Sequence, residues 1–266
     1  MNSPPSAVRA RIEPPLPVWL RRMRVLMGTS VVIEAQGASP GRAQAGIECA
    51  FAAVAEVALC LNPQHPGSDL RRINAADLGR AVPIGSGTRE VLRFAQALHA
   101  CSAGIFDPCL PLRPGRLADL EITAVAAICH APLALDCGGI AKGFAVDCAV
   151  AALQAAGCLA GLVNAGGDVR VFGAAHETIL LRRHNERYQA VELAEAALAV
   201  SDRDAPHAPS GHRGYYVRGG AGASTRRYAA VRARTAMSAD ALTKCVLLCP
   251  SALAQALLAQ FDAAAL

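Results

Sequence analysis

The stretch LDCGGIAKGFAVD, residues Leu135–Asp147, joins two adjacent glycines to a lysine between apolar runs. The glycines follow Asp136, and Lys142 stands at the start of an apolar segment of helical length that ends near Gly157. Glycine has no Cβ, so its backbone N–H and C=O groups can approach another molecule closely. The pattern therefore predicts a strand at Leu133–Asp136, a turn built against a ligand, and then a helix.

This glycine-rich loop differs from the common nucleotide-binding motifs. GGIAKG is not a P-loop, because its lysine precedes the last glycine and no Ser or Thr follows it. The glycine spacing also differs from the dinucleotide-binding fingerprint. The sequence contains no HExxH zinc-protease motif either. The loop therefore predicts a ligand site without naming the ligand.

The rest of the chain mixes predicted helices and strands without regular βαβ alternation, which predicts an α+β fold. Pro63 ends one apolar helix, and a second helix carries the buried stripe Val91, Leu92, Ala95 and Leu98. The other predicted elements are a strand interrupted at Met27-Gly28-Thr29, a strand, Gly-Gly turn and strand over 159–173, a meander over 177–200, and a strand followed by a helix from about Ser238.

The composition favours a folded protein and argues against nucleic-acid binding. Of the 266 residues, 53% are hydrophobic and 18% are charged, so most of the chain can form a core. The net charge of +5 comes mainly from arginine, and no basic stripe is interleaved with aromatic residues. We therefore expect no nucleic-acid partner, whereas a small anionic ligand is compatible with the charge.

The N-terminal sequence is rich in proline and has no apolar core of a signal peptide. We expect residues 1–22 to form a Pro-rich lead and residues 23–266 a single domain. As written, the sequence predicts a cytoplasmic protein, and a periplasmic one if the start site is misassigned. No apolar run reaches membrane-spanning length, so no membrane span is expected.

The ten cysteines form no CxxC pair and lie within apolar segments. Free, buried thiols are the expected state, which favours a reducing compartment. Cys245 and Cys249 share one helix face, but no second pair completes a zinc site.

Four aspartates stand beside turns or helix starts: Asp107, Asp136, Asp168 and Asp240. Each alone is typical of a turn or a helix cap. Four such positions, each next to an apolar segment, predict that several meet in one cleft. There their carboxylates could hold a ribose, a ring edge or a divalent cation.

In this order the motifs resemble those of the FAD:protein FMN transferase family, the ApbE type, from Met27 to about Leu248. The resemblance is carried by MGTSVVIE, PGSDLRRIN, GIFDPCLPL, LDCGGIAKGFAVD, LVNAGGDVRVFG and RTAMSADALTKC. It implies a two-lobed fold with mixed, largely antiparallel sheets flanked by helices and the site between the lobes. It also implies Mg²⁺-dependent transfer of FMN from FAD to a Thr or Ser of an acceptor flavoprotein.

The resemblance assigns roles position by position. The catalytic residues would be Asp240 and Lys142. The metal would be bound by the Gly139 carbonyl, the Asp240 carboxylate and the Thr243 carbonyl. The FAD-binding residues would be Met27, Ile105, Phe106, Asp107, Asp136 and Lys142.

Three positions depart from the family pattern. The residue four after Asp240 is Lys244 instead of threonine, and an ammonium there would repel a divalent cation or replace it with an internal ion pair. The H-x-I-D-P segment is missing, although His212 lies nearby, and Gln64 stands where an aromatic residue is expected. The alternative function is therefore a catalytically impaired paralogue that acts as a flavin-binding or scaffold protein.

Overall fold

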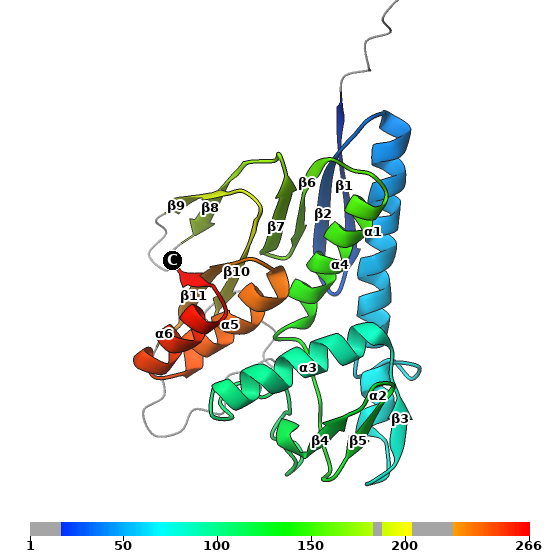
Figure 1. Ribbon diagram of the computed structural model, residues 1–266, viewed down its shortest axis with the longest axis vertical. Helices are drawn as coiled ribbons and strands as arrows, with labels where there is room; N and C mark the ends of the chain where they lie inside the picture. Colours follow the sequence, from blue (N-terminus) through cyan, green and yellow to red (C-terminus); the bar gives the residue numbers. More distant parts are fainter. Residues whose placement is uncertain (1–16, 183–187, 204–225) are drawn as a thin grey trace, which may run out of the picture.

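The computed structural model describes residues 17–182, 188–203 and 226–266, which form an α+β fold (Figure 1). Its largest element is a seven-stranded sheet in the order β1-β2-β6-β7-β10-β11-β12, and every neighbouring pair in it is antiparallel. The strands are β1 (Val18–Leu26), β2 (Thr29–Gly37), β6 (Ala160–Ala165), β7 (Asp168–Gly173), β10 (Ala196–Asp202), β11 (Tyr228–Ala233) and β12 (Ala264–Ala265).

The two faces of this sheet are covered by different layers. Alternate strand residues point to opposite faces. Val163 therefore lies in the main core under the helices, whereas its neighbour Leu162 lies in a smaller cluster on the other face. That second cluster includes residues of the separate two-stranded sheet of β8 (Glu177–Arg182) and β9 (Tyr188–Leu193).

Helices cover the main-core face. α1 (Pro40–Cys60) contacts β1 and β2, α4 (Ala141–Ala155) contacts β6 and β7, and α5 (Ala236–Leu248) contacts β10 and β11. α6 (Ser251–Gln260) follows α5 and packs against it. By length and composition, α1 is the one helix among the described residues that could cross a membrane. Core helices of globular proteins meet the same criterion, and α1 buries Ile47, Phe51 and Val54 in the main core.

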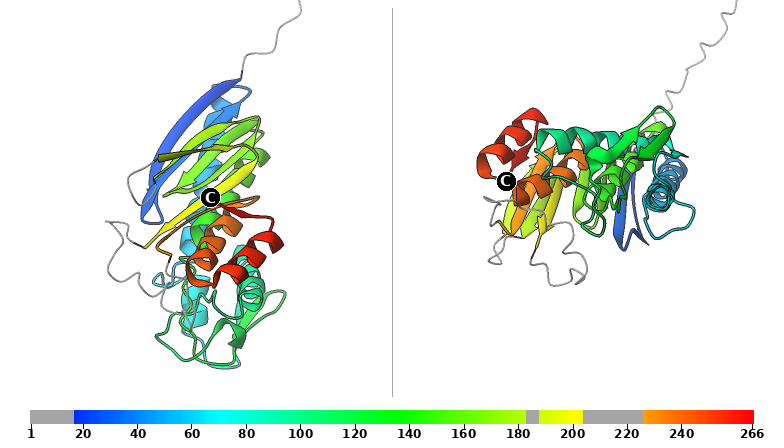
Figure 2. Two further views of the ribbon diagram at one scale, coloured as in Figure 1. Left: turned by 90° about the vertical axis from the view of Figure 1, so that its left-hand side faces the viewer. Right: turned by 90° about the horizontal axis from the view of Figure 1, so that it is seen from below.

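A second, smaller part of the fold lies below the large sheet in Figure 1 and in the left view of Figure 2. It contains α2 (Asp69–Asn74), α3 (Ser86–Cys101), the 3₁₀ helix η1 (Leu117–Asp119) and a three-stranded sheet, β3 (Ala81–Pro83), β5 (Ala126–Cys129) and β4 (Leu120–Ile122), with β5 in the middle. The predicted stripe of α3 is confirmed, because Val91, Leu92, Ala95 and Leu98 are all buried. One hydrophobic core joins the two parts.

Two predicted elements were wrong. Met27-Gly28 is the turn of a β1–β2 hairpin and not an interruption within one strand, since Leu26 pairs with Thr29. Both turn residues have positive φ, 51° for Met27 and 71° for Gly28, as a tight hairpin turn of this hand requires. The predicted strand Leu133–Asp136 is reduced to a single bridge between Leu135 and Cys109.

Three further expectations from the sequence can be compared with the structure. β1 begins at Val18, so the expected boundary after residue 22 falls inside this strand. The meander over 177–200 is split, because β8 and β9 pair with each other while β10 joins the large sheet. All ten cysteines are free, as expected, and six of them are buried.

Candidate functional site

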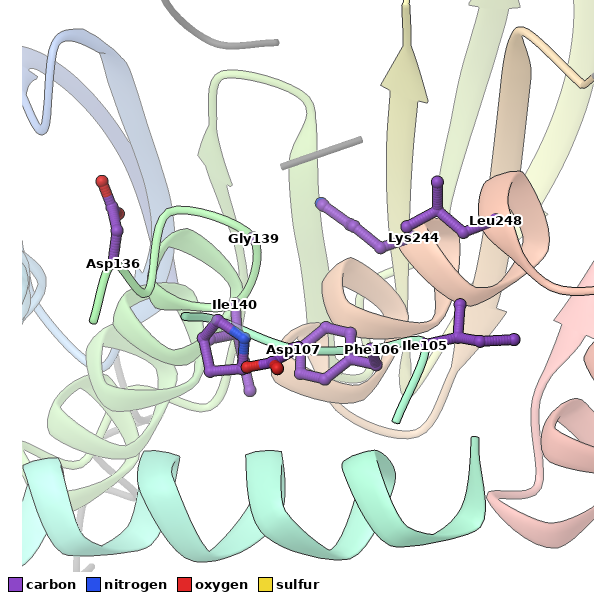
Figure 3. A pocket seen from close by; sticks show the side chains of 9 residues that line it. Ile105, Phe106, Asp107, Asp136, Gly139, Ile140, Lys244 and Leu248 are labelled. Carbon is purple, nitrogen blue, oxygen red and sulfur yellow. The ribbon is translucent and has the colours of Figure 1, made fainter. Parts of the chain in front are cut away.

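A small pocket, with a cavity volume of about 20 Å³, lies where the loop after α3, the loop before α4 and helix α5 meet (Figure 3). Three of the predicted FAD-binding residues, Ile105, Phe106 and Asp107, come from the first loop, and a fourth, Asp136, comes from the second. The other lining residues are Pro108, Gly139, Ile140, Lys244 and Leu248. Three segments that are well separated in the sequence, around residues 105–108, 136–140 and 244–248, thus form one concave site.

Asn74, the last residue of α2, fixes the segment that leads into the glycine-rich loop. Its side-chain amide donates to the Leu135 carbonyl at 2.9 Å, and its side-chain oxygen accepts the Leu135 N–H at 2.7 Å. These bonds replace a strand neighbour, which explains why no regular strand forms there. The Asp136 N–H donates to the Pro108 carbonyl at 2.9 Å, so the two pocket loops are joined.

The carboxylates of the two loops serve different purposes. Asp136 accepts the Gly138 N–H at 2.9 Å, which turns the chain toward α4, and the residue stays partly exposed. Asp107 accepts the Cys109 N–H at 2.9 Å and the Arg116 Nε–H at 3.0 Å, with a side chain only 1% exposed. Asp107 therefore lines the pocket while its carboxylate shapes the loop from within.

Lys142, in the first turn of α4, forms an ion pair with Asp168 at the start of β7. The Nζ to Oδ2 distance is 2.5 Å, and the Asp168 side chain is 1% exposed. Burial, together with the charge of Asp240, raises the pKa of Asp168 to about 6, although Lys142 and Lys244 oppose this shift. Gly166 and Gly167, both with positive φ, form the tight β6–β7 turn that puts Asp168 there.

Asp240 on α5 is completely buried, and both of its carboxylate oxygens are engaged. Oδ1 forms an ion pair with the Lys244 ammonium, one helical turn later, and Oδ2 accepts the Gly143 N–H at 3.1 Å. Lys244 also donates to the Asp240 main-chain carbonyl at 3.1 Å. Burial alone would raise the pKa of Asp240, but the two lysine ammonium groups and the Gly143 N–H outweigh it and hold this pKa below its ordinary value.

Helices α4 and α5 cap each other. Gly143 lies in the first turn of α4, so its N–H has no partner within the helix and is satisfied by Asp240 of α5. In return, Asp147 of α4 accepts the N–H groups of Ala236 and Met237 at the start of α5, at 2.9 and 2.8 Å. This exchange brings Lys142 and Lys244, the two lysines of the chain, to the same contact.

Four predicted site residues are not among those that line the pocket: Met27, Lys142, Asp240 and Thr243. Asp240 contacts the lining residue Lys244. Met27, in the β1–β2 turn, is not among the lining residues and lies beside the β6–β7 turn, where Gly166 donates to the Ser30 carbonyl. The Thr243 hydroxyl is buried, donating to the Asp240 carbonyl at 2.6 Å and lying 2.7 Å from the Ser201 hydroxyl. The role of its main-chain carbonyl stays a prediction. His212 lies outside the described residues, and Gln64 is exposed.

The side chains around Asp240 do not suit a divalent cation. The Lys244 side chain extends beside Gly139 (Figure 3), and its Cε would lie 3.4 Å from a Cβ built on that glycine. Its ammonium is paired with Asp240, so it lies between these two predicted metal-binding residues. No group of three or more His, Cys, Asp or Glu residues in the described ranges could hold a metal ion. A cation would have to displace an ammonium that is already paired with its main ligand.

Two contributing residues, Asp147 and Ser201, were not predicted from the sequence, and a third, Asp168, was expected only as one of four aspartates of which several would meet in one cleft. Asp168 had a sequence signal, because it follows a Gly-Gly turn, as Asp136 precedes one. Asp147 lies two turns into α4, and its role in capping α5 depends on how the helices cross. Ser201 meets Thr243 only across the α5–β10 contact, which no local pattern shows.

Residues 27–266 match the sequence pattern of the ApbE family. A curated FAD:protein FMN transferase from Rhodobacter capsulatus is 26% identical over 231 residues, covering 73% of this chain and 42% of that protein. The chain thus spans less than half the length of this relative.

Solved structures share the fold. A flavinyl transferase ApbE from Pseudomonas stutzeri, in its apo form, has a TM-score of 0.76 at 21% identity, covering 94% of this chain and 90% of that one. The flavin transferase ApbE from Vibrio cholerae has a TM-score of 0.77 at 17% identity, covering 94% and 93%. At these identities the likeness shows the fold alone.

Proposed function

The chain belongs to the ApbE family, and from this premise we propose that it is an FAD:protein FMN transferase. The observation that carries the proposal is the pocket itself. Ile105, Phe106 and Asp107 from one loop and Asp136 from another line one pocket, as a shared FAD-binding role requires.

The proposed reaction transfers a phosphoryl group. The hydroxyl oxygen of an acceptor Thr or Ser attacks the phosphorus on the FMN side of FAD. A new P–O bond forms, the bond from that phosphorus to the bridging oxygen breaks, AMP leaves with the bridging oxygen, and the hydroxyl proton is released. Because such transition states spread negative charge over the phosphate oxygens, positioning and positive charge carry most of the catalysis.

This chain supplies that positive charge from two lysines. Lys142 is held by the buried Asp168, which fixes the direction of its ammonium, and its side chain is 31% exposed. Lys244 reaches into the pocket from α5. In the family the metal would add charge neutralisation at the phosphates, but the residues around Asp240 do not suit it, so we assign no step to a metal here.

The test is a flavinylation assay. The protein is incubated with FAD and an acceptor protein carrying a flavinylation threonine, with Mg²⁺ or with a chelator, and in-gel flavin fluorescence is recorded. We expect a fluorescent acceptor, a weaker signal from Asp136→Asn, and an unchanged signal from Arg80→Met, which removes an exposed charge outside the pocket. A dark acceptor in both conditions, where an intact family member labels it, would contradict the proposal.

A second candidate function is a flavin-binding scaffold without transfer activity. The Lys244–Asp240 ion pair favours it, because this pair stands where the family pattern has a metal ligand and a threonine. The two candidates differ in products. A scaffold binds FAD intact, whereas a transferase or a related pyrophosphatase releases AMP, which chromatography of the incubated nucleotide detects.

A further inference from the structure

We propose that the Lys244 ammonium is a built-in cation that replaces the divalent metal, so that the pocket binds a dinucleotide pyrophosphate without free metal. This inference rests on the proposed function for its ligand, the pyrophosphate of FAD. The other part of the proposal, that Lys244 excludes a metal ion from the Asp240 site, rests on the structure alone.

The first support is the position of the ammonium. Lys244 lies one helical turn after Asp240, so its side chain folds back along α5 and meets the carboxylate of that residue. Its aliphatic part passes beside Gly139 and its Nζ contacts both Asp240 Oδ1 and the Asp240 carbonyl. The ammonium thus takes the place between Gly139 and Asp240 that a bound cation would need.

The second support is the number of donors. An ammonium has three N–H donors. Within the described part of the chain, Asp240 accepts two of them, through Oδ1 and its carbonyl oxygen. Lys244 also lines the pocket, and its side chain is 10% exposed to solvent. One donor therefore remains to meet a phosphate oxygen from the pocket side.

The third support is the use of lysine in this sequence. The chain has 26 lysine and arginine residues, and lysine stands only at positions 142 and 244. Both lysines pair with a buried aspartate at the α4–α5 contact. Arginine supplies the positive side-chain charge everywhere else, whereas these two positions carry a compact ammonium in place of a planar guanidinium. The residue type fits the role of a point charge in place of an ion.

Metal binding is tested without FAD. Thermal unfolding of the wild-type protein and of Lys244→Thr, which restores the family residue, is measured in chelator and with added Mg²⁺ or Mn²⁺. We expect no shift for the wild type. In Lys244→Thr, Asp240 loses its partner, so the variant melts lower in chelator and regains stability with metal, because a ligand that binds only the folded state raises its stability. A similar metal-dependent shift in the wild type would overturn the proposal.

Ligand binding is tested by calorimetric titration with FAD, again in chelator and with Mg²⁺. We expect the wild-type dissociation constant for FAD to agree between the two conditions within about twofold. Lys244→Met is expected to weaken FAD binding by at least about tenfold in both conditions, because it loses a charge-assisted contact. Lys244→Arg, which keeps the charge, and the control Arg80→Met are expected to keep binding closer to the wild type. Circular dichroism confirms that each variant is folded.

The outcomes separate the two proposals. FAD binding by the wild type that needs Mg²⁺ would overturn the built-in cation and leave the transferase proposal standing. Full FAD affinity in folded Lys244→Met would also overturn it. If the wild type binds no FAD in either condition, the proposed function fails, and the metal-shift experiment still decides whether Lys244 excludes the ion.

Discussion

The contact between α4 and α5 makes a sharp prediction for Gly143→Ala. A Cβ at this position would lie 2.2 Å from the Ala236 carbonyl oxygen and 2.8 Å from the Asp240 Cβ. The obstructing atoms belong to backbone or sit next to it, so no flexible side chain can move aside. The two helices would have to separate by about 1 Å at the point where each caps the other.

The expected cost combines three effects. Overpacking of a tight contact costs about 1–3 kcal/mol. Stretching the bonds that join Gly143 to Asp240, and Ala236 and Met237 to Asp147, removes about 1 kcal/mol for each bond lost. Alanine returns about 0.5–1 kcal/mol, because it is the better helix residue. With all three bonds lost, the net prediction is a loss of about 3–5 kcal/mol in the free energy of unfolding.

The assay is urea unfolding followed by circular dichroism, with Gly41→Ala as a matched control. Gly41 also lies in the first turn of a helix, α1, but a Cβ there would meet no atom within 4 Å. The control is therefore expected to be as stable as the wild type or about 0.5–1 kcal/mol more stable. If Gly143→Ala matches Gly41→Ala, the helices are not in the tight contact described, and the reasoning is refuted.

Three further predictions concern the same region. Asn74→Ala, which removes both hydrogen bonds to Leu135, is expected to cost roughly 1–3 kcal/mol in urea unfolding and to weaken FAD binding; unchanged values for both would contradict its positioning role. Asp147→Ala leaves two N–H groups of α5 uncapped and should lower the free energy of unfolding by roughly 1–4 kcal/mol, with Asp147→Asn between it and the wild type. Burial and a neighbouring carboxylate raise the pKa of Asp168 from 3.8 to about 6, so the folded state holds this proton more tightly than the unfolded state. The wild type should therefore lose roughly 2–3 kcal/mol relative to Asp168→Asn as the pH rises from about 4 to about 7, and parallel stability profiles would contradict this assignment.

The parts of the fold that the sequence predicted are those with a local cause. The apolar stripe of α3 recurs with the period of a helix, and all four of its residues are buried. The Gly166-Gly167 turn needs positive φ at both residues, which glycine adopts readily. The strand prediction at Leu133–Asp136 failed, because the Asn74 side chain takes the place of a neighbouring strand at Leu135.

The site could be predicted in part for the same reason. The spacing of Asp240 and Lys244 already places them on one side of a helix, so their pairing is a local consequence of the sequence. The pairing of Lys142 with Asp168 depends instead on the packing of α4 beside β7. The turn at Met27 was misread since a non-glycine residue with φ of 51° is uncommon and leaves no clear sequence signal.

The mutual capping of α4 and α5 also has a consequence for the dynamics of the protein. Neither helix can fray at its start without releasing a carboxylate that belongs to the other, so the two should open as one cooperative unit. In hydrogen exchange, the amides of Gly143, Ala236 and Met237 are then expected to exchange at matching rates although they lie about ninety residues apart. A ligand held between the two helices would slow all three together, which would make these amides reporters of occupancy for the whole site.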